Sequence, residues 1–97
     1  YNAFARAEST ISIGGSAQIT SSTSVGGIAI GNGSSVASGV TDAIAFGRDI
    51  IASRSNTLSV REIETQRIGG GIVMYSPNGT GYKLTVSDAG DPVFTAL

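Results

Sequence analysis

Two glutamates, Glu62 and Glu64, have a spacing that could serve catalysis. Alternate residues of a β-strand point to the same side, so in a strand these carboxyl groups would be neighbours. Carboxyl groups separated by about 5 to 9 Å can act as acid and as nucleophile or base in glycoside hydrolysis. A solvated, charged strand is the simpler interpretation, and we favour it for this segment.

The rest of the sequence offers little further catalytic chemistry. The chain contains neither histidine nor cysteine, which removes the Ser-His triad, the Cys-His pair and the usual zinc sites. The glycine-rich run at 31–36, GNGSSV, lacks the third glycine of a dinucleotide-binding loop, and no Gly-Lys-Ser/Thr sequence is present. We therefore expect no enzyme activity, no cofactor and no metal. A fragment that cleaves capsule sugars is the alternative that the carboxylates leave open.

Aromatic side chains flank one loop and suggest binding rather than catalysis. Tyr75 and Tyr82 lie on either side of the sequence SPNGTG, with Asn78 in the loop and Lys83 next to it. Aromatic rings stack on sugar faces and tyrosine hydroxyls form hydrogen bonds, so these four residues could contact a receptor glycan. The alternative is that the two tyrosines form a cross-strand pair that covers a sheet.

Charge and hydropathy exclude several classes of partner. Charged residues make up 13% of the 97 residues and the formal net charge is −1, so no basic surface is available for nucleic acid or an anionic membrane. No apolar run approaches the length of a membrane-spanning helix. We expect neither nucleic acid nor membrane insertion. Because the sequence starts at Tyr1 without an initiator methionine, we expect a fragment or a processed product.

A repeat supplies the elements that must position these residues. Residues 28–31 read IAIG, residues 43–47 read AIAFG, and a weaker copy, ISIG, occupies 11–14. The aligned glycines lie seventeen and sixteen residues apart, which is too short for a pair of helices. Within each copy the apolar residues alternate with the period of a strand. The pattern predicts one coil of two short strands in each repeat.

Four regions follow from this pattern. We expect 1–10 to be a strand that continues an upstream shaft, with the start of a short helix as the alternative. The repeat occupies 11–61, and 62–71 forms an exposed neck that ends in three glycines. Residues 72–97 predict a three-stranded antiparallel meander, because two turn sequences, SPNGTG and SDAGD, separate three apolar runs.

The blocks at 28–31, 37–39 and 43–47 resemble the head repeats of YadA-like trimeric autotransporter adhesins. This resemblance implies a left-handed parallel β-roll in which three chains pack about a threefold axis. It also implies that the large apolar residues of the repeat face either the roll interior or the trimer axis. These residues are Ile13, Ile30, Val36, Ile44 and Phe46.

The C-terminal sequence 72–97 resembles the terminal segment of tailed-phage fibre and spike proteins. Together the two resemblances imply the distal part of a phage tail fibre or tailspike, a rigid homotrimer of the virion tail that attaches to a host receptor such as a polysaccharide. The meander would then form a trimeric β-prism or tip whose core includes Ile72, Leu84 and Val86. The alternatives are the head of a bacterial trimeric adhesin at the cell surface, and a trimerisation segment that binds no receptor.

Overall fold

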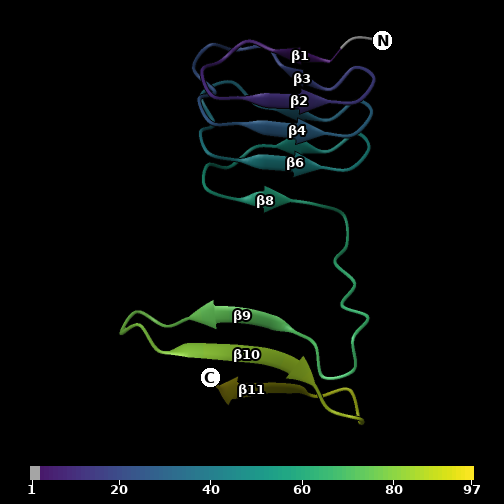
Figure 1. Ribbon diagram of the computed structural model, residues 1–97, viewed down its shortest axis with the longest axis vertical. Helices are drawn as coiled ribbons and strands as arrows, with labels where there is room; N and C mark the ends of the chain where they lie inside the picture. Colours follow the sequence, from purple (N-terminus) through teal and green to yellow (C-terminus); the bar gives the residue numbers. More distant parts are fainter. Residues whose placement is uncertain (1–2) are drawn as a thin grey trace. The chain divides into compact units, whose positions relative to one another are not determined.

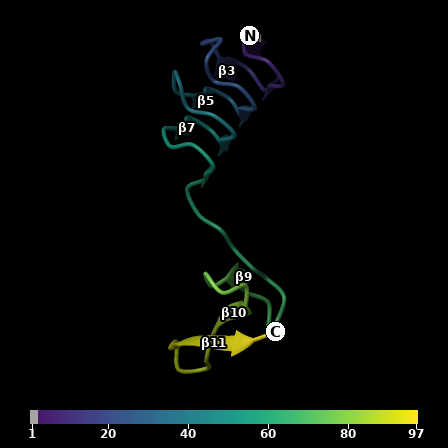
Figure 2. The ribbon, with the colours of Figure 1, turned by 90° about the vertical axis from the view of Figure 1, so that its left-hand side faces the viewer.

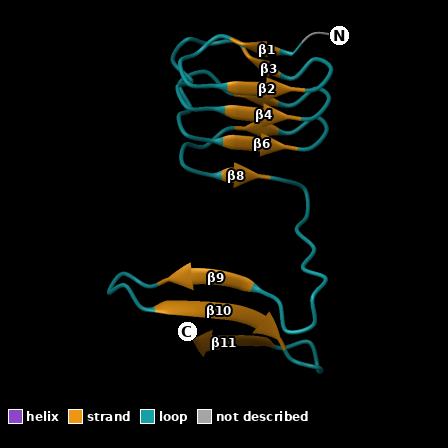
Figure 3. Cartoon of the chain, viewed as in Figure 1, coloured by secondary structure: helices purple, strands orange, loops and turns teal. Residues whose placement is uncertain are grey.

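A computed structural model describes residues 3–97, which form strands, turns and loops with no helix (Figure 3). The prediction of an all-β protein is therefore confirmed. None of the described residues forms a helix that could cross a membrane. The chain divides into two compact units, Tyr1–Glu62 and Ile63–Leu97, and each is described by itself.

The first unit is a β-solenoid of about four coils (Figure 1). Each coil contributes one short strand to each of two parallel sheets, which Figure 2 shows from the side. The first sheet consists, in spatial order, of β1 (Phe4–Ala5), β3 (Gln18–Ile19), β5 (Ser35–Val36) and β7 (Ile51–Ala52). The second sheet consists of β2 (Ile11–Ile13), β4 (Ile28–Ile30), β6 (Ile44–Phe46) and β8 (Leu58–Ser59).

The strand register aligns the repeat copies that the sequence contains. Ile28 pairs with Ile44, Ala29 with Ala45 and Ile30 with Phe46. Because successive residues of a strand point to opposite sides, the middle residue of each three-residue strand points inward and the outer two point outward. The exposures agree, since Ala29 and Ala45 are fully buried.

Small side chains fill the solenoid interior, so its two sheets bury little apolar surface. The apolar core cluster consists of alanines together with Ile19 and Val36. Full burial of a Val or Ile side chain contributes about 1.5 to 3 kcal/mol, and alanine contributes much less. The interior therefore defines the coil without supplying a large hydrophobic stabilisation.

Corner residues with left-handed backbone conformation turn the chain between the sheets. Gly26 and Asp42 have φ of 73° and 52°, and they occupy equivalent corners of successive coils. The Asp42 amide donates to the carbonyl of Val25 at 3.0 Å, which joins the two corners. The Asp42 carboxylate lies over Gly26, in the space that a Cβ on this glycine would need. The absence of a side chain at Gly26 thus accommodates the aspartate of the next coil.

The first predicted region belongs to the solenoid. β1 pairs in parallel with β3, with Phe4 opposite Gln18 and Ala5 opposite Ile19. Ser9 has a φ of 57°, as expected for a corner that precedes the coil of Gly26. Residues 1–10 therefore contain a strand, as expected, and this strand is part of the first coil. Tyr1 and the following residue lie outside the described range.

The neck at 62–71 contains no strand, and most of its residues are exposed. Of the two interpretations of this segment, the exposed strand is wrong, because its backbone pairs with no other strand, and the exposed neck is the one that fits these residues. The short apolar alternation before it forms only β8, which pairs with β6. A turn closes the neck, in which the Gly70 amide donates to the carbonyl of Arg67 at 2.7 Å.

The second unit is a three-stranded antiparallel sheet with the spatial order β11, β10, β9. Its strands are β9 (Ile72–Tyr75), β10 (Gly81–Val86) and β11 (Pro92–Ala96). Both connections are closed by hydrogen bonds from Ser76 to Thr80 and from Ser87 to Asp91. No residue of 63–97 is buried. A sheet this small, with no core of its own, is marginal as an isolated structure.

Candidate functional site

An exposed apolar face on the solenoid is the first candidate for a functional surface. It is made by the outward residues of β2, β4, β6 and β8, and we call it the outer apolar face. Within it, Ile13 and Phe46 are each 55% exposed, although both are large. Its members are Ile11, Ile13, Ile28, Ile30, Ile44, Phe46 and Leu58.

The outward residues of the opposite sheet are more mixed. They include Gln18 and Ser35, which pair with one another, together with Phe4 and Ile51. Charged side chains are absent from both sets, but only the outer apolar face lacks polar residues along its whole length. A large exposed apolar patch commonly marks a surface that another molecule covers.

The structure separates the predicted core residues of the repeat into two groups. Val36 is 4% exposed and points into the solenoid. The others point outward and belong to the outer apolar face: Ile13, Ile30, Ile44 and Phe46. Sequence reasoning left the two directions open, because alternation identifies two sides of a strand but not which side is interior. The signal was the small residue between the large ones, since the sheet of β2, β4, β6 and β8 turns alanine inward, while the larger inward residues Ile19 and Val36 come from the opposite sheet.

The two faces of the C-terminal sheet differ in composition. Residues that lie directly opposite one another in paired strands share a face. One face, which we call the uncharged face, consists of Ile72, Met74, Tyr82, Leu84, Val86, Pro92, Phe94 and Ala96. The other, which we call the mixed face, consists of Val73, Tyr75, Gly81, Lys83, Thr85, Val93 and Thr95. The predicted core residues of this sheet, Ile72, Leu84 and Val86, all lie on the uncharged face, and Val86 is 68% exposed.

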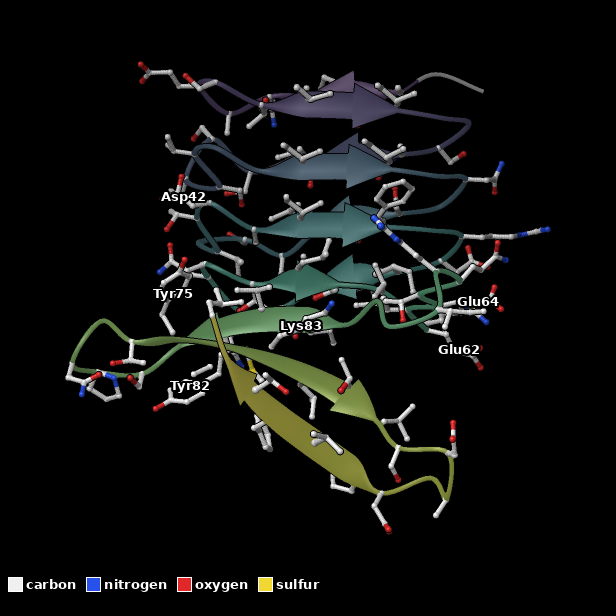
Figure 4. The ribbon with its side chains drawn as sticks, turned by 60° about the horizontal axis from the view of Figure 1, so that its bottom comes forward. Asp42, Glu62, Glu64, Tyr75, Tyr82 and Lys83 are labelled. Carbon is white, nitrogen blue, oxygen red and sulfur yellow. The ribbon has the colours of Figure 1, made fainter. Side chains whose placement is uncertain are left out.

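The two loop tyrosines belong to different faces. Tyr82 lies opposite Met74 on the uncharged face, whereas Tyr75 lies opposite Gly81 on the mixed face with Lys83 (Figure 4). The interpretation of Tyr75 and Tyr82 as a cross-strand pair is therefore wrong, because the register offsets them by one residue. The structure brings Tyr75 and Lys83 to one face and does not bring Tyr82 there.

The loop between β9 and β10 is held by its own side chains. The Asn78 Oδ1 atom accepts hydrogen bonds from the Ser76 hydroxyl at 2.6 Å and from the Thr80 amide at 3.1 Å. The turn itself therefore uses the side-chain oxygen of Asn78, which was a predicted receptor contact. A hollow of about 310 Å³ next to this loop is lined by Met74, Tyr75, Ser76, Tyr82 and Phe94.

The carboxylates are dispersed and exposed. Glu62 ends the first unit and Glu64 lies in the second, both in the strandless neck, so the strand spacing that could have paired them is absent. The Glu64 carboxylate accepts a hydrogen bond from the Gln66 amide at 3.1 Å. Residues 3–97 contain no group of acidic side chains that could hold a metal ion. Within the same range the one ion pair, Arg48 with Asp49 at 3.6 Å, is exposed and contributes little.

Comparison with known proteins gives no relative for this chain. No protein-family model, no curated protein and no solved structure matches it.

Proposed function

We propose that this chain is a rigid, homotrimeric segment of a phage tail fibre or tailspike that serves in host attachment. The observation that carries the proposal is the outer apolar face, a set of large side chains that one chain leaves in water. Fully covering a residue such as Ile13 or Phe46 stabilises an assembly by about 1.5 to 3 kcal/mol, before the cost of association. The solenoid interior, filled by alanines, supplies much less.

A second copy of the same chain fits this surface better than an unrelated partner. The face carries no charge, so identical faces approach one another without electrostatic repulsion. Three solenoids about a threefold axis would cover all three faces at once, in the left-handed β-roll arrangement implied by the YadA-like resemblance. The C-terminal sheet, as a β-prism or tip, would be covered by its equivalents in the same way.

Attachment follows from having three equivalent surfaces on a stiff support. Each copy presents one weak contact to a cell-surface polysaccharide, and simultaneous engagement of three contacts raises the overall affinity. The phage interpretation rests on the resemblance of 72–97 to fibre termini. The solenoid favours a second candidate, the head of a bacterial trimeric adhesin, because its repeat blocks resemble that family.

Sedimentation equilibrium at micromolar concentration tests the assembly, and the expected result is a single species with three times the mass of the chain. A folded monomer would contradict the proposal. Binding of the labelled protein to whole cells, with and without added surface polysaccharide, tests attachment. Competition by polysaccharide is expected. A trimer that does not bind the cells of any host of the parent virion would favour a purely structural role.

A further inference from the structure

The C-terminal sheet presents two chemically different faces, and each must meet a different environment. Every residue of 63–97 is at least partly exposed in the single chain. The sheet therefore gains its stability from something that covers one of its faces. Its two faces offer unequal surfaces for such a contact.

The uncharged face is suited to a contact with copies of itself. It has no ionisable group apart from the Tyr82 hydroxyl, and its central residues Leu84 and Phe94 lie directly opposite one another. Burial of such a face costs little desolvation, because few polar atoms lose water. The hollow lined by Met74, Tyr82 and Phe94 offers space for an apolar side chain from a neighbour, and Tyr75 and Ser76 border the same hollow at the loop end of the sheet.

The mixed face is unsuited to the same contact. It carries Lys83 in its centre, together with Thr85 and Thr95. If three copies met through this face, three lysine ammonium groups would approach one another out of water, and no residue of the face carries a compensating negative charge. Solvent is therefore the environment that this face favours.

We infer that the uncharged face is the contact between copies in the C-terminal unit, and that the mixed face, with Tyr75 and Lys83, stays open to solvent and ligand. This inference rests on the proposed homotrimer and goes further, because it separates two residues that were expected to act together. Tyr82 becomes an assembly residue, whereas Tyr75 remains available for a receptor.

Single cysteines test the inference locally, because the chain has none of its own. Val73 and Met74 are neighbours on β9 that point to opposite faces, and they are 49% and 43% exposed in the single chain. Without assembly, Val73→Cys and Met74→Cys should thus react with a maleimide at similar rates. In the assembled protein we expect Val73→Cys to react about tenfold faster or more, because an interface core excludes the reagent. In denaturant both variants should react equally.

A second pair of cysteine variants, on β11, controls for local structural changes that the first pair could cause. In the single chain Phe94 is 61% exposed and Val93 is 38% exposed, so Phe94→Cys should be the faster of the two. Assembly through the uncharged face reverses that order. Trimers in which Val73→Cys and Met74→Cys react at similar rates, and Phe94→Cys still reacts faster than Val93→Cys, would overturn the inference and leave the proposed function standing. A wild-type protein that sediments as a monomer would instead overturn the proposed function, and the inference with it.

Discussion

Tyr75 lies directly opposite Gly81, and its ring covers this glycine. A Cβ atom on Gly81 would lie 3.0 Å from Cε2 of Tyr75 and 2.8 Å from Cδ1 of Leu97. The ring is thereby supported from below by the sheet, while 69% of Tyr75 remains exposed. An exposed aromatic ring that packs against the backbone of the sheet is a suitable platform for stacking a sugar.

We expect Tyr75→Ala to weaken cell binding by about tenfold or more and to leave the trimer intact, since an aromatic contact is lost in each of three copies. Tyr82→Ala is the matched control on the other face. It should weaken assembly first, and affect cell binding only at concentrations at which the trimer dissociates. Flow cytometry with labelled protein and sedimentation of the same samples distinguish the two effects. If both variants remained trimers and lost cell binding to the same extent, the assignment of Tyr75 to ligand binding and of Tyr82 to assembly would be contradicted.

The outer apolar face can be tested by placing a charge at its centre. Ile30 pairs with Ile13 on one side and with Phe46 on the other, so Ile30→Lys introduces an ammonium group into the proposed contact between copies. We expect a monomer by sedimentation at micromolar concentration, because an unpaired buried charge costs several kcal/mol. Gln18→Lys is the control, since Gln18 is exposed on the outward side of the opposite sheet. A trimer in both variants would place the contact elsewhere.

The solenoid interior should reject larger side chains. Ala45 is fully buried, and its register neighbours on the same sheet are Ala29 and Ser59. We expect Ala45→Leu to destabilise the protein by about 1 to 3 kcal/mol, because the two sheets would have to separate. The adjacent Ile44→Leu, which points outward, keeps the volume and should change stability much less. Denaturant unfolding at one fixed protein concentration gives both values, and a neutral Ala45→Leu would mean that the interior contains unfilled space.

The sequence predicted the period of the solenoid well. Each corner needs a residue that tolerates a positive φ, and the alternating blocks IAIG and AIAFG recur at the spacing of one coil. It did not predict which side of each strand faces inward, since alternation distinguishes the two sides of a strand but not the interior from the exterior. In this solenoid the interior is narrow, so Ala29 is inside and Ile30 is outside. The fully buried Ser24 was also missed, and it is satisfied by donating to the Ala37 carbonyl at 2.8 Å.

The C-terminal strands were placed closely, because two turn sequences bound the middle strand. Alternation within the middle strand separates Tyr82 from Lys83, but the faces of Tyr75 and Tyr82 relative to one another depend on the register between the strands. A shift of one residue moves every side chain to the other face. The strand pairing supplies this register, with Tyr75 opposite Gly81 and Tyr82 opposite Met74. The strand within residues 1–10 was expected, but its place in the first coil of the solenoid was not, because these residues lack the glycine that marks the later copies.

Two glycines of the solenoid differ both in backbone conformation and in close packing. Gly31 has a φ of 126°, and a Cβ atom there would overlap the carbonyl of Gly47 in the next coil. Gly39 has a φ of 77°, but no atom lies within 4 Å of the place that its Cβ would occupy. Gly39→Ala therefore forces only a left-handed conformation on alanine, at a cost of about 1 to 2 kcal/mol.

Gly31→Ala adds a collision between successive coils, and the φ of 126° at Gly31 is also less accessible to alanine than the φ of 77° at Gly39, so it should destabilise the protein by more than Gly39→Ala. The Gly47 amide also donates to the Ile30 carbonyl at 2.8 Å, directly beside the site of collision, and separation of the coils would weaken this hydrogen bond. Denaturant unfolding of both variants at equal protein concentration measures the difference. Equal destabilisation would mean that the coils can move apart at this corner without cost, contrary to a continuous ladder of parallel strands.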